Sequence, residues 1–146
     1  MKNFQHKDFR LGIIGGGQLG RMLIQAGIDL NINFAIVDPD ENAPCRSLVD
    51  DFTLGSLKDF DTVIEFGKKC DLLTIEIEHI NIDALFELEK MGKTIYPSPS
   101  LLKIVQDKGI QKQFYKDTGI PTSDFVIVDG KLPENTKFPI VHKLRK

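Results

Sequence analysis

The sequence feature that most limits the fold is a glycine-rich segment, Gly15–Gly20, that separates an apolar stretch from an amphipathic one. The stretch before it, Leu11–Ile14, is short and apolar, which is typical of a strand buried in a parallel sheet. The stretch after it repeats apolar residues at helical spacing, and these form one predicted face: Leu19, Met22, Leu23, Ala26 and Leu30. A strand, a tight turn and a helix in this order predict the first unit of an α/β fold.

The glycine-rich segment satisfies the pattern G-x-G-x-x-G, which allows bare backbone to approach a ligand closely. The N-terminus of the helix that follows adds unpaired N–H groups and the positive end of the helix dipole. These features predict a cradle for a phosphate or another anion, formed by Gly15, Gly16, Gly17 and Gly20. The alternative interpretation is that the glycines only allow the helix and the strand to pack closely.

Strand-like and helix-like segments continue to alternate after this turn. Short apolar runs predict further strands at Phe34–Val37, Phe52–Leu54, Leu72–Ile75 and Thr94–Tyr96. Between them, Asp59–Lys69 and Ile82–Met91 carry apolar residues at helical spacing. Because strands joined by helices form right-handed crossovers, the pattern predicts an α/β, Rossmann-like parallel sheet with helices on both faces.

The layout changes at Pro97, the first residue of a Pro-Ser-Pro sequence. Beyond it the sequence predicts two helices and then two strands, at Leu101–Val105, Gln111–Asp117, Phe125–Val128 and Ile140–Lys143. We therefore predict one domain over residues 1–97 and the start of a second over residues 98–146. About 50 residues cannot build a rich core of their own, so the second unit looks unfinished.

Composition and charge exclude several classes of protein. With 41% apolar and 27% charged residues, the 146-residue chain has the composition of a folded globular protein. Its net charge of -2 gives no reason to expect binding to nucleic acid or to an anionic membrane. No apolar run reaches the roughly 20 residues that span a bilayer, and the polar segment 1–10 is no signal peptide. Cys45 and Cys70 follow no metal-site spacing, so we expect free thiols and a cytoplasmic location.

Asp38 ends the second predicted strand, where a dinucleotide-binding fold places the acid that binds the ribose. One interpretation of this acid, together with the glycine pattern, is an NAD-binding dehydrogenase domain. The other is that Asp38 is a turn residue, because the sequence Asp38-Pro39-Asp40 favours a turn.

Several stretches, taken in order, resemble one known family. They are Leu11–Met22, Val37–Asp40 with Ala43-Pro44, Thr74–Ile80, Gln106–Lys108 with Gln111-Lys112 and Phe114, and Gly119–Thr122. These stretches are similar to those of the 5-(carboxyamino)imidazole ribonucleotide synthases, a family of the ATP-grasp superfamily, and the specificity lies in the ordered set. The resemblance implies that the first domain is a Rossmann-like pre-ATP-grasp domain that does not bind NAD, followed by the start of an ATP-grasp domain.

The resemblance also implies an activity, namely that of an ATP-dependent carbon–nitrogen ligase of purine biosynthesis. Such a ligase uses ATP and Mg²⁺ to activate bicarbonate and transfers the carboxylate to the amine of 5-aminoimidazole ribonucleotide. By resemblance, the ribonucleotide contacts Gln18, Leu19 and Glu76, and the ATP phosphates contact Lys108 and Lys143. The alternative interpretations are that Glu76 is a solvated acid at a strand end and that Lys108 belongs to a solvated helix face.

Other expectations follow from the same family. Its Mg²⁺ ligands and its phosphate-covering glycine loop correspond to positions beyond residue 146, so we expect no metal ligands and no synthase activity in this chain alone. Family members are commonly dimers, which makes a homodimer an expectation. Glu78 and His79 are expected at the rim of the site or in structural roles.

The formate-dependent glycinamide ribonucleotide transformylases are the nearest related family. They also carry a Glu-Ile-Glu sequence, which occurs here as Glu76-Ile77-Glu78, whereas the carboxylases more often have an aromatic residue between the two acids. Gln18 favours the carboxylases, because the transformylases usually have glutamate at this position. A third alternative is a small nucleotide-binding module without enzymatic activity.

Overall fold

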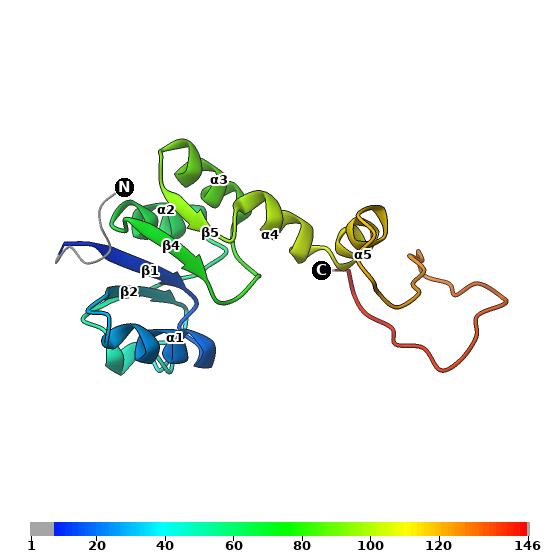
Figure 1. Cartoon of the computed structure of the whole chain (residues 1–146), viewed down its shortest axis with the longest axis horizontal. Helices are drawn as coiled ribbons and strands as arrows, with labels where there is room; N and C mark the ends of the chain where they lie inside the picture. Colours follow the sequence, from blue (N-terminus) through cyan, green and yellow to red (C-terminus); the bar gives the residue numbers. More distant parts are fainter. Residues whose placement is uncertain (1–7, 146) are drawn as a thin grey trace. The chain divides into compact units, whose positions relative to one another are not determined.

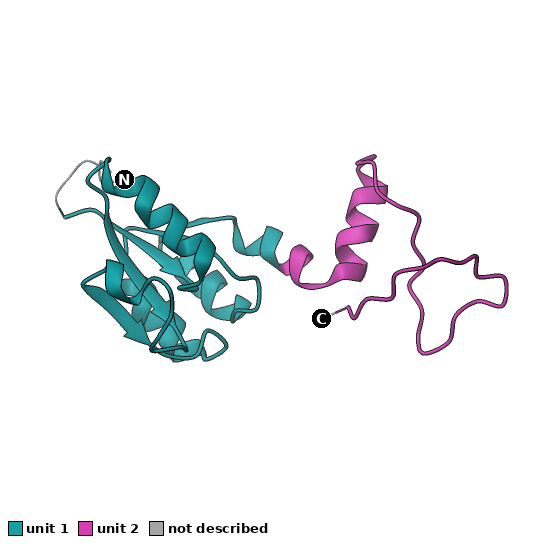
Figure 2. Ribbon diagram, turned by 90° about the horizontal axis from the view of Figure 1, so that it is seen from below, with its two compact units in different colours: residues 1–102 teal, residues 103–146 magenta. Residues whose placement is uncertain are grey.

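The computed structural model describes residues 8–145 and divides the chain into two compact units, residues 1–102 and 103–146 (Figure 2). Most of the polar N-terminal segment considered above, residues 1–7, lies outside the described residues, as does Lys146. The division lies between Leu102 and Lys103, whereas the sequence analysis placed the domain boundary at residue 97. Each unit is described separately below.

The first unit contains a five-stranded parallel sheet with the strand order β3-β2-β1-β4-β5 (Figure 1). In chain order the strands are β1 (Arg10–Ile14), β2 (Asn33–Asp38), β3 (Asp51–Leu54), β4 (Leu72–Ile75) and β5 (Thr94–Tyr96). All five predicted strands are confirmed, and so is the α/β class. The sequence signal was strong here because a strand buried on both faces reads as an uninterrupted apolar run.

Helices cover both faces of this sheet: α1 (Gln18–Ile28) lies on one face, and α2 (Phe60–Lys68) and α3 (Ile82–Lys90) lie on the other (Figure 1). A short 3-10 helix, η1 (Arg46–Leu48), follows β2. Helices α2 and α3 begin at side-chain caps, because Asp59 and Asn81 accept hydrogen bonds from backbone N–H groups one turn ahead. None of the helices among residues 8–145 is both long and apolar enough to cross a bilayer.

The pleat of the central strand separates two apolar cores. Ile14 of β1 faces α2 and α3, where it joins a cluster that includes Phe66 and Leu88. Its neighbour Ile13 faces α1 and packs with Ile24. Successive side chains of a strand point to opposite faces, so these two adjacent isoleucines belong to different cores.

The buried face of α1 differs from the predicted one. Helix α1 buries Gly20, Ile24 and Gly27, whereas most of the predicted apolar face is exposed, with Leu19 at 65% and Met22 at 57%. The reason is the distance between helix and sheet: a Cβ atom on Gly20 would lie 3.0 Å from the Gly15 carbonyl oxygen. Because its buried row is made of glycines and one isoleucine, α1 packs closer to the sheet than a row of leucines would allow.

Gly27 provides a test of this close packing. A methyl group at this position would collide with the ring of Phe34, with Cε2 at 2.9 Å. We expect Gly27→Ala to lower the free energy of unfolding by about 1–3 kcal/mol, the usual effect of overpacking. Helix propensity alone predicts the opposite sign, a gain of about 1 kcal/mol. Urea unfolding monitored by circular dichroism decides between the two signs, and exposed Gln25→Ala in the same helix is the matched control.

Two helices follow the sheet. Helix α4 (Pro99–Gln106) buries Leu102 in the core of the first unit, and α5 (Lys108–Asp117) belongs to the second unit. Both confirm predicted helices, although α5 begins earlier than predicted. Asp107 explains the earlier start, because its side chain caps the helix by accepting hydrogen bonds from Gly109 and Ile110 N–H groups.

The prediction of two strands in the second unit is wrong. Residues 125–128 and 140–143 form no strand, and apolar side chains such as Val126 and Val141 are exposed there. Strand propensity describes how well a residue fits a pleated, half-buried surface, and it forms no strand without a hydrogen-bonding neighbour. Neither segment pairs with the other or with any other described part of the chain.

A candidate site at the carboxyl ends of β1 and β4

The strand order places a crevice at the carboxyl ends of β1 and β4. From β1 the chain continues to β2 and β3 on one side of the sheet, and β4 and β5 lie on the other side of β1. The direction in which strands are added to the sheet therefore reverses at β1. Ligands of open α/β sheets bind at such a reversal. Gly15 follows β1 and Glu76 follows β4, and the Glu76 N–H donates a hydrogen bond to the Ile14 carbonyl oxygen at 2.9 Å. The two sequence motifs therefore meet at one edge of the sheet.

A cavity of about 140 Å³ opens at this edge, and its lining is Ile13, Leu19, Gly20, Leu23, Thr74, Ile75 and Glu76. It brings together two of the predicted substrate-binding residues, Leu19 and Glu76. The third, Gln18, is the exposed first residue of α1 and lies outside the lining. The lining is mainly apolar and carries one carboxylate, which suits a flat ring that bears hydrogen-bond donors.

Sequence reasoning missed four residues of this lining, Ile13, Leu23, Thr74 and Ile75. Leu23 lies one helical turn after Leu19, so the same spacing that indicated the helix also indicates this neighbour. Thr74 pairs with Ile13 across β4 and β1, which places both on the face of the sheet that α1 covers. A polar residue inside an otherwise apolar strand was the available signal for Thr74.

The Glu76 carboxylate lies against the glycine-rich turn. A Cβ atom on Gly15 would lie 2.9 Å from Glu76 Oε2, and one on Gly17 would lie 2.9 Å from Glu76 Oε1. Gly15 also has a φ of 103°, which side chains other than hydrogen rarely allow. The glycines at these two positions therefore make room for a carboxylate, in addition to forming the turn.

Two of the turn's amides are already bonded within the protein. Gly15 N–H donates to the Val37 carbonyl oxygen at 3.0 Å, and Gly16 N–H donates to Asp38 Oδ2 at 2.6 Å. Fewer amides are therefore available for the predicted phosphate cradle than its four glycines suggested. The remaining amides begin at Gly17, at the start of α1, which has no side-chain cap. A carboxylate next to them disfavours a phosphate group directly on the turn.

Asp38 is a turn residue. Besides the bond to Gly16, its Oδ1 accepts a hydrogen bond from Asp40 N–H at 2.8 Å. Both carboxylate oxygens thus hold the end of β2 to the glycine-rich turn. This use of the side chain supports the turn interpretation of Asp38.

Cys45 lies beneath the turn and is fully buried. Its N–H donates to the Gly16 carbonyl oxygen at 3.0 Å, and its Sγ lies 3.5 Å from the Gly17 carbonyl oxygen. Burial raises the pKa of this thiol, and the negative charges of Glu76 and Asp38 raise it further. Burial likewise raises the pKa of Cys70, to about 12. Both cysteines are free, as predicted, and both are neutral packing residues at physiological pH.

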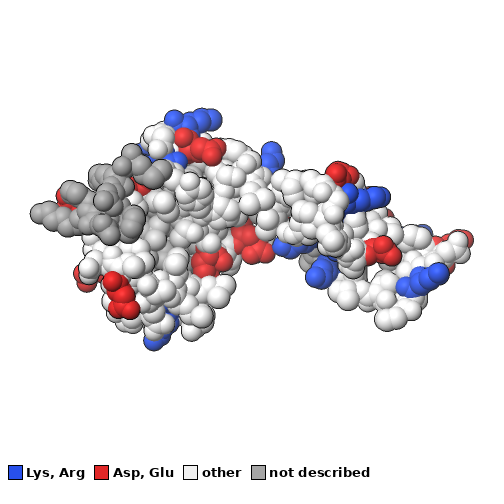
Figure 3. Space-filling model, viewed as in Figure 1, with Lys and Arg blue, Asp and Glu red and all other residues white. Residues whose placement is uncertain are grey.

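The remaining predicted residues, Lys108 and Lys143, belong to the second unit. The Lys108 Nζ donates a hydrogen bond to the Val105 carbonyl oxygen at 3.2 Å, and Lys143 is exposed. Acidic and basic side chains are interspersed on the face shown in Figure 3. Within residues 8–145, no group of three or more His, Cys, Asp or Glu side chains is arranged to hold a metal ion.

Comparison with known proteins agrees with this geometry. Residues 9–106 match the family model of the ribonucleotide synthetase preATP-grasp domain. The phosphoribosylaminoimidazole carboxylase of Vigna aconitifolia chloroplasts is 42% identical over 119 residues, which are 82% of this chain and 21% of that protein. The N5-carboxyaminoimidazole ribonucleotide synthase of Pseudomonas aeruginosa is 35% identical over 122 residues, 84% of this chain and 33% of that protein.

Solved structures show the same relationship. The N5-carboxyaminoimidazole ribonucleotide synthetase of Thermotoga maritima has a TM-score of 0.74 and 34% identity, covering 80% of this chain and 32% of its own. The Aspergillus clavatus N5-carboxyaminoimidazole synthase, solved with ADP and 5-aminoimidazole ribonucleotide, has a TM-score of 0.73 and 34% identity, covering 82% and 32%. The chain thus spans between a fifth and a third of the length of these proteins. By sequence and by structure, the chain belongs to the ribonucleotide synthetase preATP-grasp domain family.

Proposed function

We propose that this chain is the N-terminal part of an ATP-dependent ligase of de novo purine biosynthesis. The ligase carboxylates 5-aminoimidazole ribonucleotide with bicarbonate to form 5-(carboxyamino)imidazole ribonucleotide. The observation that carries the proposal is the Glu76 carboxylate, held against Gly15 and Gly17 in a small apolar crevice. The names of the related proteins support it, as does the nucleotide bound to the Aspergillus clavatus structure.

The crevice suits the base of the ribonucleotide. Glu76 accepts hydrogen bonds, so it matches an exocyclic amine, and an amine held in this way keeps its nitrogen directed at an incoming carboxyl group. In this proposal Leu19 covers the apolar part of the ring, and Gln18, the exposed first residue of α1, keeps its predicted contact with the ribonucleotide. Gly17 and Gly20 lie at the uncapped start of α1, but the Glu76 carboxylate beside Gly17 disfavours a phosphate group on the turn, so we assign hydrogen-bond donors of the ligand to this end of the crevice.

The ATP side of the reaction is assigned to Lys108 and Lys143, whose ammonium groups suit phosphate oxygens. In the proposed reaction, a bicarbonate oxygen attacks the γ-phosphorus and ADP leaves. The substrate amine then attacks the activated carbon, and inorganic phosphate leaves. Mg²⁺ supplies charge compensation at the phosphates in such reactions, but the described residues form no ligand set for it, so no step is assigned to a metal held here.

Two further assignments belong to this proposal. A homodimer is expected from the family resemblance, and the exposed apolar side chains of α1 outside the crevice, among them Met22 and Ile28, offer a surface for it. A cytoplasmic location suits the two free cysteines, because thiols persist in a reducing compartment.

Equilibrium titration of the chain with three ligands tests the proposal. We expect 5-aminoimidazole ribonucleotide to bind, and NADH not to bind, because both Asp38 oxygens are already used within the protein. Binding of NADH without the ribonucleotide would favour a dehydrogenase domain. Glycinamide ribonucleotide is the third ligand, and a clear preference for it would move the chain to the transformylases.

A further inference from the structure

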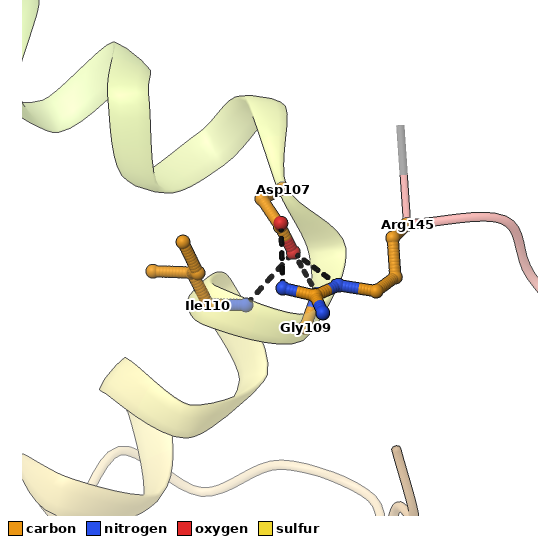
Figure 4. A network of polar contacts seen from close by, with 4 residues as sticks. All are labelled: Asp107, Gly109, Ile110 and Arg145. Carbon is orange, nitrogen blue, oxygen red and sulfur yellow. Dashed lines mark hydrogen bonds and ion pairs between the residues drawn. The ribbon is translucent and has the colours of Figure 1, made fainter. Parts of the chain in front are cut away.

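Asp107 is the one buried charged residue among residues 8–145, with 4% of its surface exposed. Its carboxylate accepts hydrogen bonds from two backbone groups, Gly109 N–H at 2.9 Å and Ile110 N–H at 3.1 Å. It also accepts from two nitrogens along one edge of a guanidinium, Arg145 Nε at 3.1 Å and Nη2 at 2.7 Å (Figure 4). Four charge-assisted bonds converge on one side chain, which is more than a helix cap requires.

Arg145 is held by its main chain as well. Its carbonyl oxygen accepts a hydrogen bond from Lys108 N–H at 2.8 Å. Gly109 makes this approach feasible, because a Cβ atom there would lie 3.0 Å from Arg145 Nε and 3.3 Å from Ile127 Cδ1. The segment that contains Arg145 is therefore fixed to the first turn of α5 at two points, across a sequence separation of 38 residues.

The Asp107 carboxylate stays ionised at physiological pH. The hydrogen bond from Arg145 holds the pKa of Asp107 at about 2, with help from the Ile110 and Gly109 amides and against the effect of burial. A carboxyl group with a lowered pKa contributes its interactions above its ordinary pKa near 4 and loses them only as the pH falls toward 2. Asp107 is therefore a fixed connection between two segments, and it does not switch near neutral pH.

The two connected segments carry the two lysines assigned to ATP. Lys108 directly follows Asp107, and Lys143 precedes Arg145 by one intervening residue. The Asp107 carboxylate occupies N–H groups at the start of α5, so it takes the place that a phosphate would otherwise have there. Binding of a phosphate chain in this unit then depends on the lysine ammonium groups and on their relative position.

We propose that Asp107 is a positioning residue for ATP, which acts through Arg145 to hold the Lys143 segment beside Lys108. The proposal rests on the proposed function, since it assumes that both lysines contact the nucleotide's phosphates. It explains why a carboxylate is buried at the start of α5, and why a glycine stands at the position where the guanidinium meets the helix.

The test is isothermal titration of the full chain with Mg·ATP. Asp107→Asn keeps a side chain that caps helices. It removes the negative charge and one of the two oxygens that accept hydrogen bonds from Arg145. We expect it to weaken ATP binding on the order of tenfold, the effect of losing one charge-assisted hydrogen bond. Exposed Asp129→Asn, the same substitution in the same unit, is the matched control and leaves affinity unchanged.

A double-mutant cycle separates positioning from general loosening of the unit. Because Asp107 acts through Lys143, Asp107→Asn combined with Lys143→Ala is expected to bind ATP no more weakly than Lys143→Ala alone. Additive losses would overturn the positioning role, and so would unchanged affinity in Asp107→Asn when Lys143→Ala weakens binding. If the unaltered chain fails to bind ATP, or if Lys108→Ala and Lys143→Ala both bind it normally, the ATP assignment itself is overturned.

Discussion

Replacing Phe66 with alanine is expected to lower the free energy of unfolding of the first unit by about 3–5 kcal/mol, the usual cost of removing a buried aromatic ring. Phe66 is 1% exposed and lies on α2, in the core between the sheet and the helices α2 and α3. The loss combines the transfer of apolar surface with the cavity that remains, since tightly packed neighbours relax only in part. Urea denaturation followed by circular dichroism measures it through the shift in midpoint.

Phe60 on the same helix is the matched control. It is the first residue of α2 and 41% exposed, so Phe60→Ala removes far less buried surface. We expect a loss of about 1 kcal/mol or less, as for most substitutions outside a core. Equal losses for the two variants would show that the core does not lie beneath α2 as described.

Glu76→Gln is expected to weaken binding of 5-aminoimidazole ribonucleotide about 10- to 100-fold, since a hydrogen bond to a charged group contributes about 1.5–3 kcal/mol. The amide keeps the shape of the side chain, so the crevice keeps its volume and only the acceptor changes. Glu78→Gln is the matched control, because this acid lies two positions further and does not line the crevice. If both variants lose affinity equally, Glu76 has no specific role in binding.

Gly17→Ala tests the same site without replacing Glu76 itself. The new methyl group would lie 2.9 Å from Glu76 Oε1, and the flexible end of the glutamate can move away. Gly17 has a φ of -72° and a ψ of -165°, which alanine adopts without strain. We therefore expect unchanged stability and weakened ribonucleotide binding. Unchanged affinity would mean that the position of the carboxylate against the turn does not matter.

The three central strands of the sheet, β1, β2 and β4, were predictable because each contains an apolar run. The buried face of α1 was not predictable in the same way. Counting apolar residues assumes that the largest ones face the core, whereas Gly20 and Gly27 face it here. Glycines in a helix contribute nothing to an apolar pattern, so the close packing of α1 is visible only in three dimensions.

Part of the candidate site could also be predicted from the sequence. The turn glycines and Glu76 are each adjacent to a strand end, and parallel strands bring their carboxyl ends to one edge. The role of Asp107 could not be predicted from the sequence, because its partner Arg145 is distant in sequence and the pairing depends on the path of the intervening residues. The prediction of strands in the second unit was wrong because it used local propensity alone. The residues around Val126 and Val141 favour a strand, but a strand also needs a hydrogen-bonding neighbour, which local sequence does not reveal.

The separation of Ile13 and Ile14 into different cores limits how this region can evolve. Deleting a single codon within β1 would exchange the faces of every residue beyond it, and both cores would lose their central side chain together. The same slip would pull Gly15 away from Glu76. We therefore expect length variation among descendants of this gene to gather in surface loops such as residues 129–135, while the stretch from Leu11 to Gly20 keeps a constant length.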